Sequence, residues 1–315
     1  MTRQLPLIPT EDGANPPLTR QSPLHEAITP FQQYLRHQGK TQHTIVAFTS
    51  DLNLLMEFAG RDTPLKALTT DRLNRFLKWM EHERGVPCSR KTYARRVTTL
   101  KVFFEYLHTV EVLNANPAKT LVQRSGSAPL PHVLTPEQIR AVLEETQHRR
   151  FAEKPDARPD LLVRLLLDTG IKKGEVMALT LADIDRTVTP PVLHIRHDSP
   201  RNKYRERDIP LDPEWLDVLD EYLAQYTPQG TIFDCTARNL EYVLKDVGEA
   251  AGITDFLLSF VVLRWTSALR DLMDGMEPDL LREKQGLSRI SWYETHAKLQ
   301  TLLAAITGGR PEGSP

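Results

Sequence analysis

A stretch rich in proline, serine and alanine divides this sequence into two halves. From Asn114 to Leu134 it reads NANPAKTLVQRSGSAPLPHVL, whereas the residues on either side repeat apolar side chains at helical spacing. Such a composition does not build a core and is typical of a linker with some reach. The 315 residues suffice for two domains, each with its own core. We therefore expect domains at 26–113 and 134–308, a linker at 114–133, and flexible tails at 1–25 and 309–315.

The first half is predicted to be a helical bundle. Thr41 begins a helix whose apolar residues recur every three or four positions up to Gly60. Another helix is expected after Thr69, and a further one from Ser89 to about His108. The first turns of this last helix hold a run of basic side chains, with a Lys further along: Arg90, Lys91, Arg95, Arg96 and Lys101.

The second half is predicted to be mainly helical with a small antiparallel sheet. Thr135 followed by Pro136 and Glu137 has the cap, the proline and the acid of a helix start. Two short alternating stretches, 192–196 and 205–211, flank a polar turn and predict a hairpin. Helices are expected near 136–146, 159–169, 213–225, 237–250, 261–274, 278–285 and 292–306.

Composition narrows the class of protein. Hydrophobic residues make up 40% and charged residues 26% of the chain, the balance of a globular protein. No apolar run reaches the roughly eighteen residues of a membrane span, and the N-terminus lacks the apolar region of a secretory signal. The two cysteines, Cys88 and Cys235, are too far apart in the sequence to indicate a metal cluster or a disulfide framework. We expect a cytoplasmic protein without a structural metal.

The net charge of −1 conceals an uneven distribution. Residues 25–125 hold 15 Lys and Arg against 9 Asp and Glu, whereas residues 126–315 hold 23 against 30. The positive charge of the first half would attract a polyanion. The acidic second half would bind one only if its basic residues gather on one face.

Several motifs occur in the second half in a fixed order. DTGIKKGEV begins at Asp168, RDIPL at Arg207, LRWT at Leu263, QGLS at Gln285 and SWYETH at Ser291. Together they resemble the two signatures and the β-hairpin of the catalytic domain of the tyrosine recombinases, the phage integrase family. The helices of the first half resemble the core-binding domain of that family, and the likeness spans about 26–306. It implies a two-domain, C-shaped clamp around double-stranded DNA.

The resemblance also implies a set of catalytic groups. Two arginines hold the oxygens of the scissile phosphate, because a planar guanidinium matches two oxygens at once. A hairpin lysine protonates the leaving oxygen, histidines handle protons, and a tyrosine attacks phosphorus to form a 3′-phosphotyrosine. The family needs no metal and no cofactor.

This sequence departs from that set at most positions. The first arginine falls on Lys172, whereas the second is kept as Arg264. The hairpin lysine is matched by Lys203, although strand spacing points nearer Asn202. The two histidine positions fall on Val261 and Leu287. If Thr295-His296 is the pair that follows the nucleophile, that position holds Glu294, and Tyr293 lies one residue before it.

These departures favour DNA binding over DNA cleavage. Catalytic residues that act as a unit fail together, whereas phosphate contacts add one at a time. We therefore expect a largely inactive relative that binds DNA through a set of basic residues: Arg90, Lys91, Arg95, Arg96, Lys101, Lys172, Lys203 and Arg264. Two alternatives stay open: a divergent recombinase using Tyr293 with Lys172 and Arg264, and a helical protein-interaction module without DNA.

The C-terminal segment from His296 to Ile306 is predicted to be an amphipathic helix through Leu299, Leu302 and Leu303. The family resemblance implies that such a helix docks on a neighbouring subunit, giving a homo-oligomer or an assembly with a partner recombinase on DNA. Folding of the helix back onto its own domain is the alternative.

Overall fold

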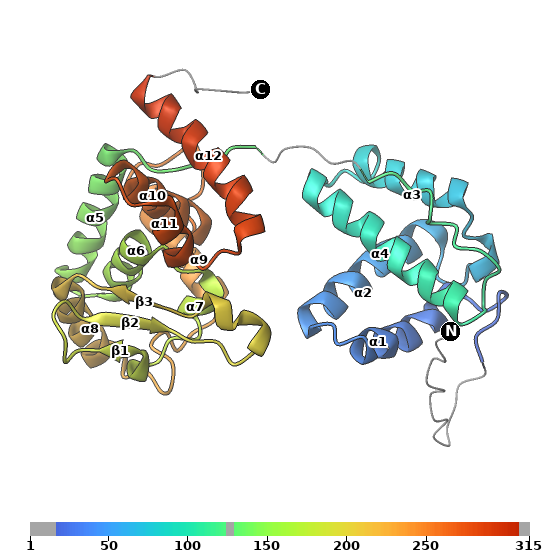
Figure 1. Ribbon diagram of the computed structural model, residues 1–315, viewed down its shortest axis with the longest axis horizontal. Helices are drawn as coiled ribbons and strands as arrows, with labels where there is room; N and C mark the ends of the chain where they lie inside the picture. The colour runs from blue at the N-terminus through green and yellow to red at the C-terminus, as the bar shows by residue number, and fades with distance from the viewer. Residues whose placement is uncertain (1–16, 124–128, 309–315) are drawn as a thin grey trace. The chain divides into compact units, whose positions relative to one another are not determined.

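The chain splits into two compact units, Met1–Ala128 and Pro129–Pro315 (Figure 1). The computed structural model describes residues 17–123 and 129–308, and each unit has a hydrophobic core of its own. Most of the two expected tails lies outside the described residues. Within the N-terminal one, however, Leu24 is fully buried and its N–H donates to the carbonyl of Thr63 at 2.9 Å.

The first unit is helical around an aromatic core. Its helices are η1 (Leu24–Ala27), α1 (Ile28–His37), α2 (Gln42–Ala59), η2 (Leu65–Ala67), α3 (Thr70–His82) and α4 (Arg90–Thr109). The side chains of Thr41, Thr69 and Ser89 each accept a backbone N–H and so begin α2, α3 and α4 at the predicted positions. Phe31, Phe103 and Phe104 pack edge to face at the centre.

The second unit packs helices around α6 and beside a small sheet. Its helical elements are α5 (Pro136–Arg150), α6 (Arg158–Thr169), α7 (Lys173–Val176), η3 (Leu181–Asp183), η4 (Pro200–Arg205), α8 (Pro213–Tyr226), α9 (Ala237–Ala250), α10 (Phe260–Met273), α11 (Pro278–Lys284) and α12 (Arg289–Thr307). Helices α5, α8 and α10 all pack against α6, whose inward residues are fully buried. The predicted mainly helical fold is confirmed.

The sheet has three antiparallel strands in the order β1 (Ile184–Asp185), β2 (Val192–Ile195) and β3 (Arg207–Pro210). Val192 pairs with Pro210 and Ile195 with Arg207, as the predicted hairpin requires. Two details differ from the prediction. Strand β1, which is only two residues long, was not predicted, and the polar turn contains the 3-10 helix η4 rather than a simple loop.

The segment predicted to be a linker is packed at both ends. Leu121 is buried in the core of the first unit, and the side chain of Asn116 accepts the N–H of Ala118 at 2.8 Å. At the other end, His132 stacks on Phe256, and the N–H of Leu134 donates to the Thr266 hydroxyl at 2.9 Å. Residues 124–128 lie outside the described residues. Composition does not indicate these side-chain anchors.

Among the residues that the structure describes, no helix is long and apolar enough to cross a membrane.

Candidate functional site

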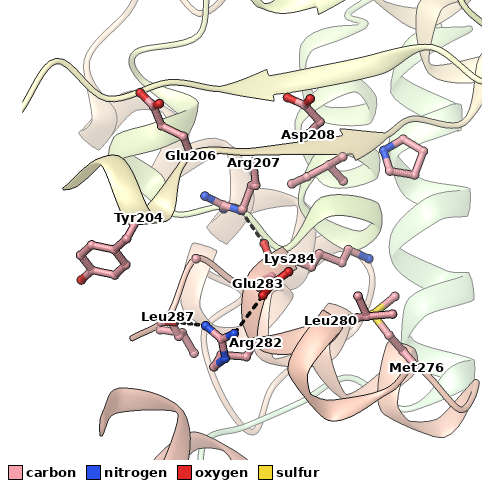
Figure 2. Close-up of a pocket in the computed structure, with 13 residues that line it drawn as sticks. Tyr204, Glu206, Arg207, Asp208, Met276, Leu280, Arg282, Glu283, Lys284 and Leu287 are labelled. Carbon is pink, nitrogen blue, oxygen red and sulfur yellow. Dashed lines mark hydrogen bonds and ion pairs between the residues drawn. The ribbon is translucent and has the colours of Figure 1, made fainter. Parts of the chain in front are cut away.

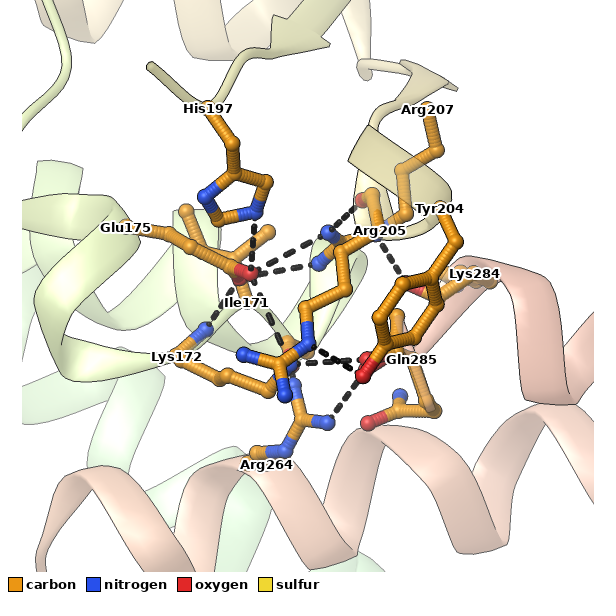
Figure 3. Close-up of polar contacts among 12 residues, drawn as sticks. Ile171, Lys172, Glu175, His197, Tyr204, Arg205, Arg207, Arg264, Lys284 and Gln285 are labelled. Carbon is orange, nitrogen blue, oxygen red and sulfur yellow. Dashed lines mark hydrogen bonds and ion pairs between the residues drawn. The ribbon is translucent and has the colours of Figure 1, made fainter. Parts of the chain in front are cut away.

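Lys172 and Arg264 are brought together by the backbone of one short segment (Figure 3). Helix α6 ends at Thr169, Gly170 follows it in the left-handed conformation, and the chain turns there so that Lys172 caps α7. Arg264, on α10, donates to the carbonyl of Gly170 and, at 2.5 Å, to that of Gln285. The amine of Lys172 donates to the next carbonyl, Gly286, at 2.8 Å. Adjacent carbonyls therefore orient the two cations.

Gly286 is needed for this arrangement. Its φ is +55°, and a Cβ there would lie 2.7 Å from Nη1 of Arg207 and 3.4 Å from Nζ of Lys172. A larger residue would be strained in this conformation and would push the guanidinium away. The glycine thus permits the close approach of two cations to one backbone segment.

Glu175 and Arg207 form an ion pair next to these cations. Their side chains are 5% and 7% exposed, and the closest atoms, Oε2 of Glu175 and Nη2 of Arg207, are 2.9 Å apart. Nη1 of Arg207 donates to the other carboxylate oxygen at 3.2 Å, and Nε donates to the carbonyl of Lys284 at 2.6 Å. The backbone N–H of Lys172 donates to Glu175 at 2.8 Å. This pair links β3, α7 and the end of α11.

The charge states of the site follow from these contacts. Burial acts to raise the pKa of Glu175, but the hydrogen bonds and charge of Arg207 hold that pKa at about 2, so the carboxylate stays ionised. Burial lowers the pKa of Lys172 to about 8; Glu175 opposes the shift, and nearby Arg264 adds to it. Burial also lowers the pKa of Arg264, to about 10, which leaves it charged at neutral pH.

A cavity of about 530 Å³ opens beside these two cations. Its basic lining residues are Lys172, Lys173, Arg238, Lys245 and Arg264. The one carboxylate among its described lining residues is that of Glu241, which pairs with Lys173 at 2.7 Å. Clustered cations within low-dielectric walls attract an anion, and an arginine beside a lysine suits a phosphate group. The overall acidity of the second half does not extend to this cavity.

Two residues of this site, Arg207 and His197, were not predicted. Arg207 was interpreted only as part of a strand, although strand alternation places its side chain inward. His197 follows β2, and its Nε2 lies 3.6 Å from Oε1 of Glu175. Glu175, three residues after Lys172, could have indicated them, because a carboxylate that is buried requires cationic partners.

The basic side chains of α4 fall into two groups. Arg90 and Lys91 are exposed and form no ion pair with another described residue. Arg95 and Arg96, however, face the buried carboxylate of Asp51 on α2, at 2.8 Å and 3.5 Å. The side chain of Arg96 is only 11% exposed. Part of the predicted DNA-binding run is therefore used in packing α4 against α2.

The other predicted site residues lie apart from the pair Lys172 and Arg264. Lys203 is exposed in η4 and pairs with Glu206 at 2.9 Å. Lys101 is half-buried on α4 beside Glu105 in a cavity of about 360 Å³. Tyr293, on α12, is 84% exposed, and no contact recorded among the described residues joins it to Lys172 or Arg264.

The inward face of α12 packs within its own unit. Leu299 and Leu302 are buried against Ala268 and Leu269 of α10 and Leu281 of α11. The amphipathic helix predicted from His296 is thus part of a longer helix, which begins where Ser288 caps it. The apolar face proposed to dock on a second subunit is covered in cis.

Comparison with known proteins supports the resemblance. Residues 28–109 match the family described as phage integrase, N-terminal SAM-like domain. "Tyrosine recombinase XerC" of Herpetosiphon aurantiacus is 27% identical over 284 residues, which are 85% of this chain and 89% of that protein. The first unit thus matches the phage integrase N-terminal domain, and the chain as a whole is similar to tyrosine recombinases.

Two further comparisons agree with this similarity. "Tyrosine recombinase XerC" of a Mycobacterium species is 29% identical over 164 residues, or 51% of this chain, and the chain spans about half of that relative's length, 55%. The structure of XerH site-specific recombinase bound to a palindromic difH substrate, a post-cleavage complex, superposes with a TM-score of 0.67 at 17% identity. That match covers 91% of this chain and 97% of the other, and it shows a shared fold.

The two histidine positions of the family are apolar here. Val261, at the first histidine position, is exposed and lines the same cavity as Lys172 and Arg264. Leu287, at the second, borders a different cavity of about 570 Å³ between β3 and α11 (Figure 2). Its carbonyl accepts from Arg282 at 3.4 Å. Neither side chain can transfer a proton. Among the described residues, no group of His, Cys, Asp or Glu is placed to hold a metal ion.

Proposed function

We propose that this protein binds duplex DNA through its phosphates and has little or no strand-cleaving activity. The observation that carries the proposal is the pair Lys172 and Arg264, oriented by adjacent backbone carbonyls at one cationic cavity. The two side chains are fixed before any ligand arrives, so little conformational entropy is lost when a phosphate binds between them. The family relationship makes DNA the natural source of that phosphate.

Binding is expected to survive the substitutions that remove catalysis. Lys172 supplies positive charge but not the paired hydrogen bonds of an arginine. Each missing donor to the equatorial oxygens of the phosphate costs a few kcal/mol of transition-state stabilisation. Because these free energies add, the corresponding factors in the cleavage rate multiply. Val261 and Leu287 supply neither a donor nor a base. Several absent groups therefore lower cleavage by orders of magnitude, whereas each phosphate contact contributes to affinity on its own.

The first unit provides a second set of proposed contacts. Arg90 and Lys91 are exposed at the start of α4 and carry charge that no described acidic residue pairs. Arg95 and Arg96 contribute less, because part of their charge is neutralised by Asp51. We propose Lys101 and Lys203 as minor, peripheral contacts.

The test has two steps, because the natural DNA site is unknown. A tightly bound duplex is first selected from random DNA by the full chain. The same sequence is then prepared with a nick beside the contacted phosphate, so that a covalent protein–DNA adduct cannot religate. We expect retarded complexes on a native gel and no adduct on a denaturing gel.

Two outcomes would overturn this proposal. An adduct that disappears in Tyr293→Phe would establish the divergent-enzyme alternative. Failure to select any duplex, together with stable association with a protein partner, would favour the interaction module instead. The variant Lys172→Arg with Val261→His is expected to leave the adduct absent, because the nucleophile position holds Glu294 if Thr295-His296 is the pair that follows it.

A further inference from the structure

The cationic cavity has an apolar wall. Tyr242, Leu257 and Val261 line it, and they are 49%, 64% and 60% exposed. Single exposed apolar side chains are ordinary on a protein surface. Three that share one cavity with five cations are unusual, because the same concave surface then offers both charge and apolar area.

Helix α9 carries the tyrosine of this wall between two of the basic residues. Arg238, Tyr242 and Lys245 are spaced by four and three residues, so they lie along one face of the helix. Arg238 donates to the Tyr242 hydroxyl from Nε at 3.0 Å and from Nη2 at 2.9 Å. Because the hydroxyl is engaged along the helix, the tyrosine ring is held in place with its apolar surface in the cavity.

We propose that the apolar wall contacts the 5-methyl group of a thymine next to the phosphate bound by Lys172 and Arg264. This inference rests on the proposed function. The cavity cations would draw the phosphate, and the neighbouring base edge would then lie against Leu257 and Val261. The methyl group of thymine is the one apolar feature of the major groove, and apolar side chains recognise it.

Charge complementarity selects this occupant. Glu241, Glu249 and Glu175 pair with Lys173, Lys245 and Lys172, so five basic side chains face three carboxylates. The remaining positive charge favours a polyanion over an apolar helix. A phosphate alone would leave Leu257 and Val261 exposed to water. A thymine beside the phosphate would cover both kinds of surface at once.

The experiment removes the methyl group and nothing else. In the duplex selected by the full chain, each thymine is replaced in turn by deoxyuridine, and dissociation constants are measured by fluorescence anisotropy. Burial of one methyl group is worth about threefold to fivefold in affinity. We expect one or two positions to lose that much and the remaining positions to be unaffected.

Protein variants connect the effect to this wall. In Leu257→Ser with Val261→Ser, the thymine and deoxyuridine duplexes should bind equally, because the two changes remove the same contact. Val261→Ile keeps an apolar wall and should keep the discrimination. Leu280→Ser is the matched control, since Leu280 is 60% exposed in the same unit but lines another cavity.

The outcomes separate this inference from the proposed function. If binding is retained but no deoxyuridine substitution weakens it, the apolar contact is absent while DNA binding stands. Discrimination that persists in the double serine variant would also overturn the inference. If the chain selects no duplex at all, the proposed function fails, and this inference fails with it.

Discussion

Lys172 carries the positive charge at a position where the family uses arginine, and a lysine can lose that charge. Burial lowers the pKa of Lys172 to about 8, with Arg264 and Arg207 adding to the shift and Glu175 opposing it. A neutral amine no longer attracts a phosphate. Affinity should therefore fall as the pH rises through that value.

The measurement is the dissociation constant for the selected duplex between about pH 7 and about pH 9. We expect weakening of about tenfold at most, the worth of one charged phosphate contact. Lys172→Arg keeps its charge throughout and should show a flat profile. An equal decline in Lys172→Arg and in the natural protein would assign the titration to another group.

Glu175 is expected to be essential for stability. Glu175→Gln leaves the guanidinium of Arg207 buried without its anion, which costs about 3–5 kcal/mol in the free energy of unfolding. Glu241→Gln is the control, because its pair with Lys173 is exposed and is worth about 1 kcal/mol or less. Urea denaturation of both variants measures the difference, and equal stabilities would contradict the assignment.

The same ion pair predicts a pH dependence of stability. The pKa of Glu175 is lowered to about 2 in the folded protein, from an ordinary 4.5. Its stabilising contribution is therefore complete above the ordinary value and is lost as the pH falls toward about 2. In Glu175→Gln this part of the acid destabilisation should be missing.

At the scale of elements, α4 divides its basic residues between packing and solvent. Arg96→Ala removes a partner of the buried Asp51 and should cost about 1–3 kcal/mol of unfolding free energy. Lys91 is exposed, so Lys91→Ala should lower the free energy of unfolding by less than about 0.5 kcal/mol. For DNA affinity the order should reverse, with Lys91→Ala weakening binding more. An Arg96 variant of normal stability but weakened DNA binding would contradict this division.

Helix starts and the hairpin were predictable because their signals are local. Thr41, Ser89 and Thr135 cap helices through atoms three residues away, and alternation in 192–196 depends on neighbours alone. The pairing of Asp51 with Arg95 depends on a tertiary contact across 44 residues, and that of Glu175 with Arg207 on one across 32. The periodicity of the sequence does not predict contacts between residues so far apart.

At the scale of the whole molecule, each unit presents its own cationic surface. In the second unit many carboxylates are engaged elsewhere; Asp160, for example, pairs with Arg164 at 3.1 Å and with Arg150 at 3.4 Å. The closure of the two units around DNA as a clamp stays a prediction. Assembly with a second copy also stays a prediction. If α12 took part, it would use a face other than the one that holds the buried Leu299 and Leu302.

The central claim is that the protein binds DNA through phosphates contacted by both units, and the salt dependence of binding tests it most directly. We predict that the logarithm of the binding constant falls linearly with the logarithm of the salt concentration. Arg90→Ala with Lys91→Ala, in the first unit, and Lys172→Met, in the second, should each flatten that slope by roughly one unit per lost contact. Binding that does not depend on salt, or a slope that neither variant changes, would contradict the account.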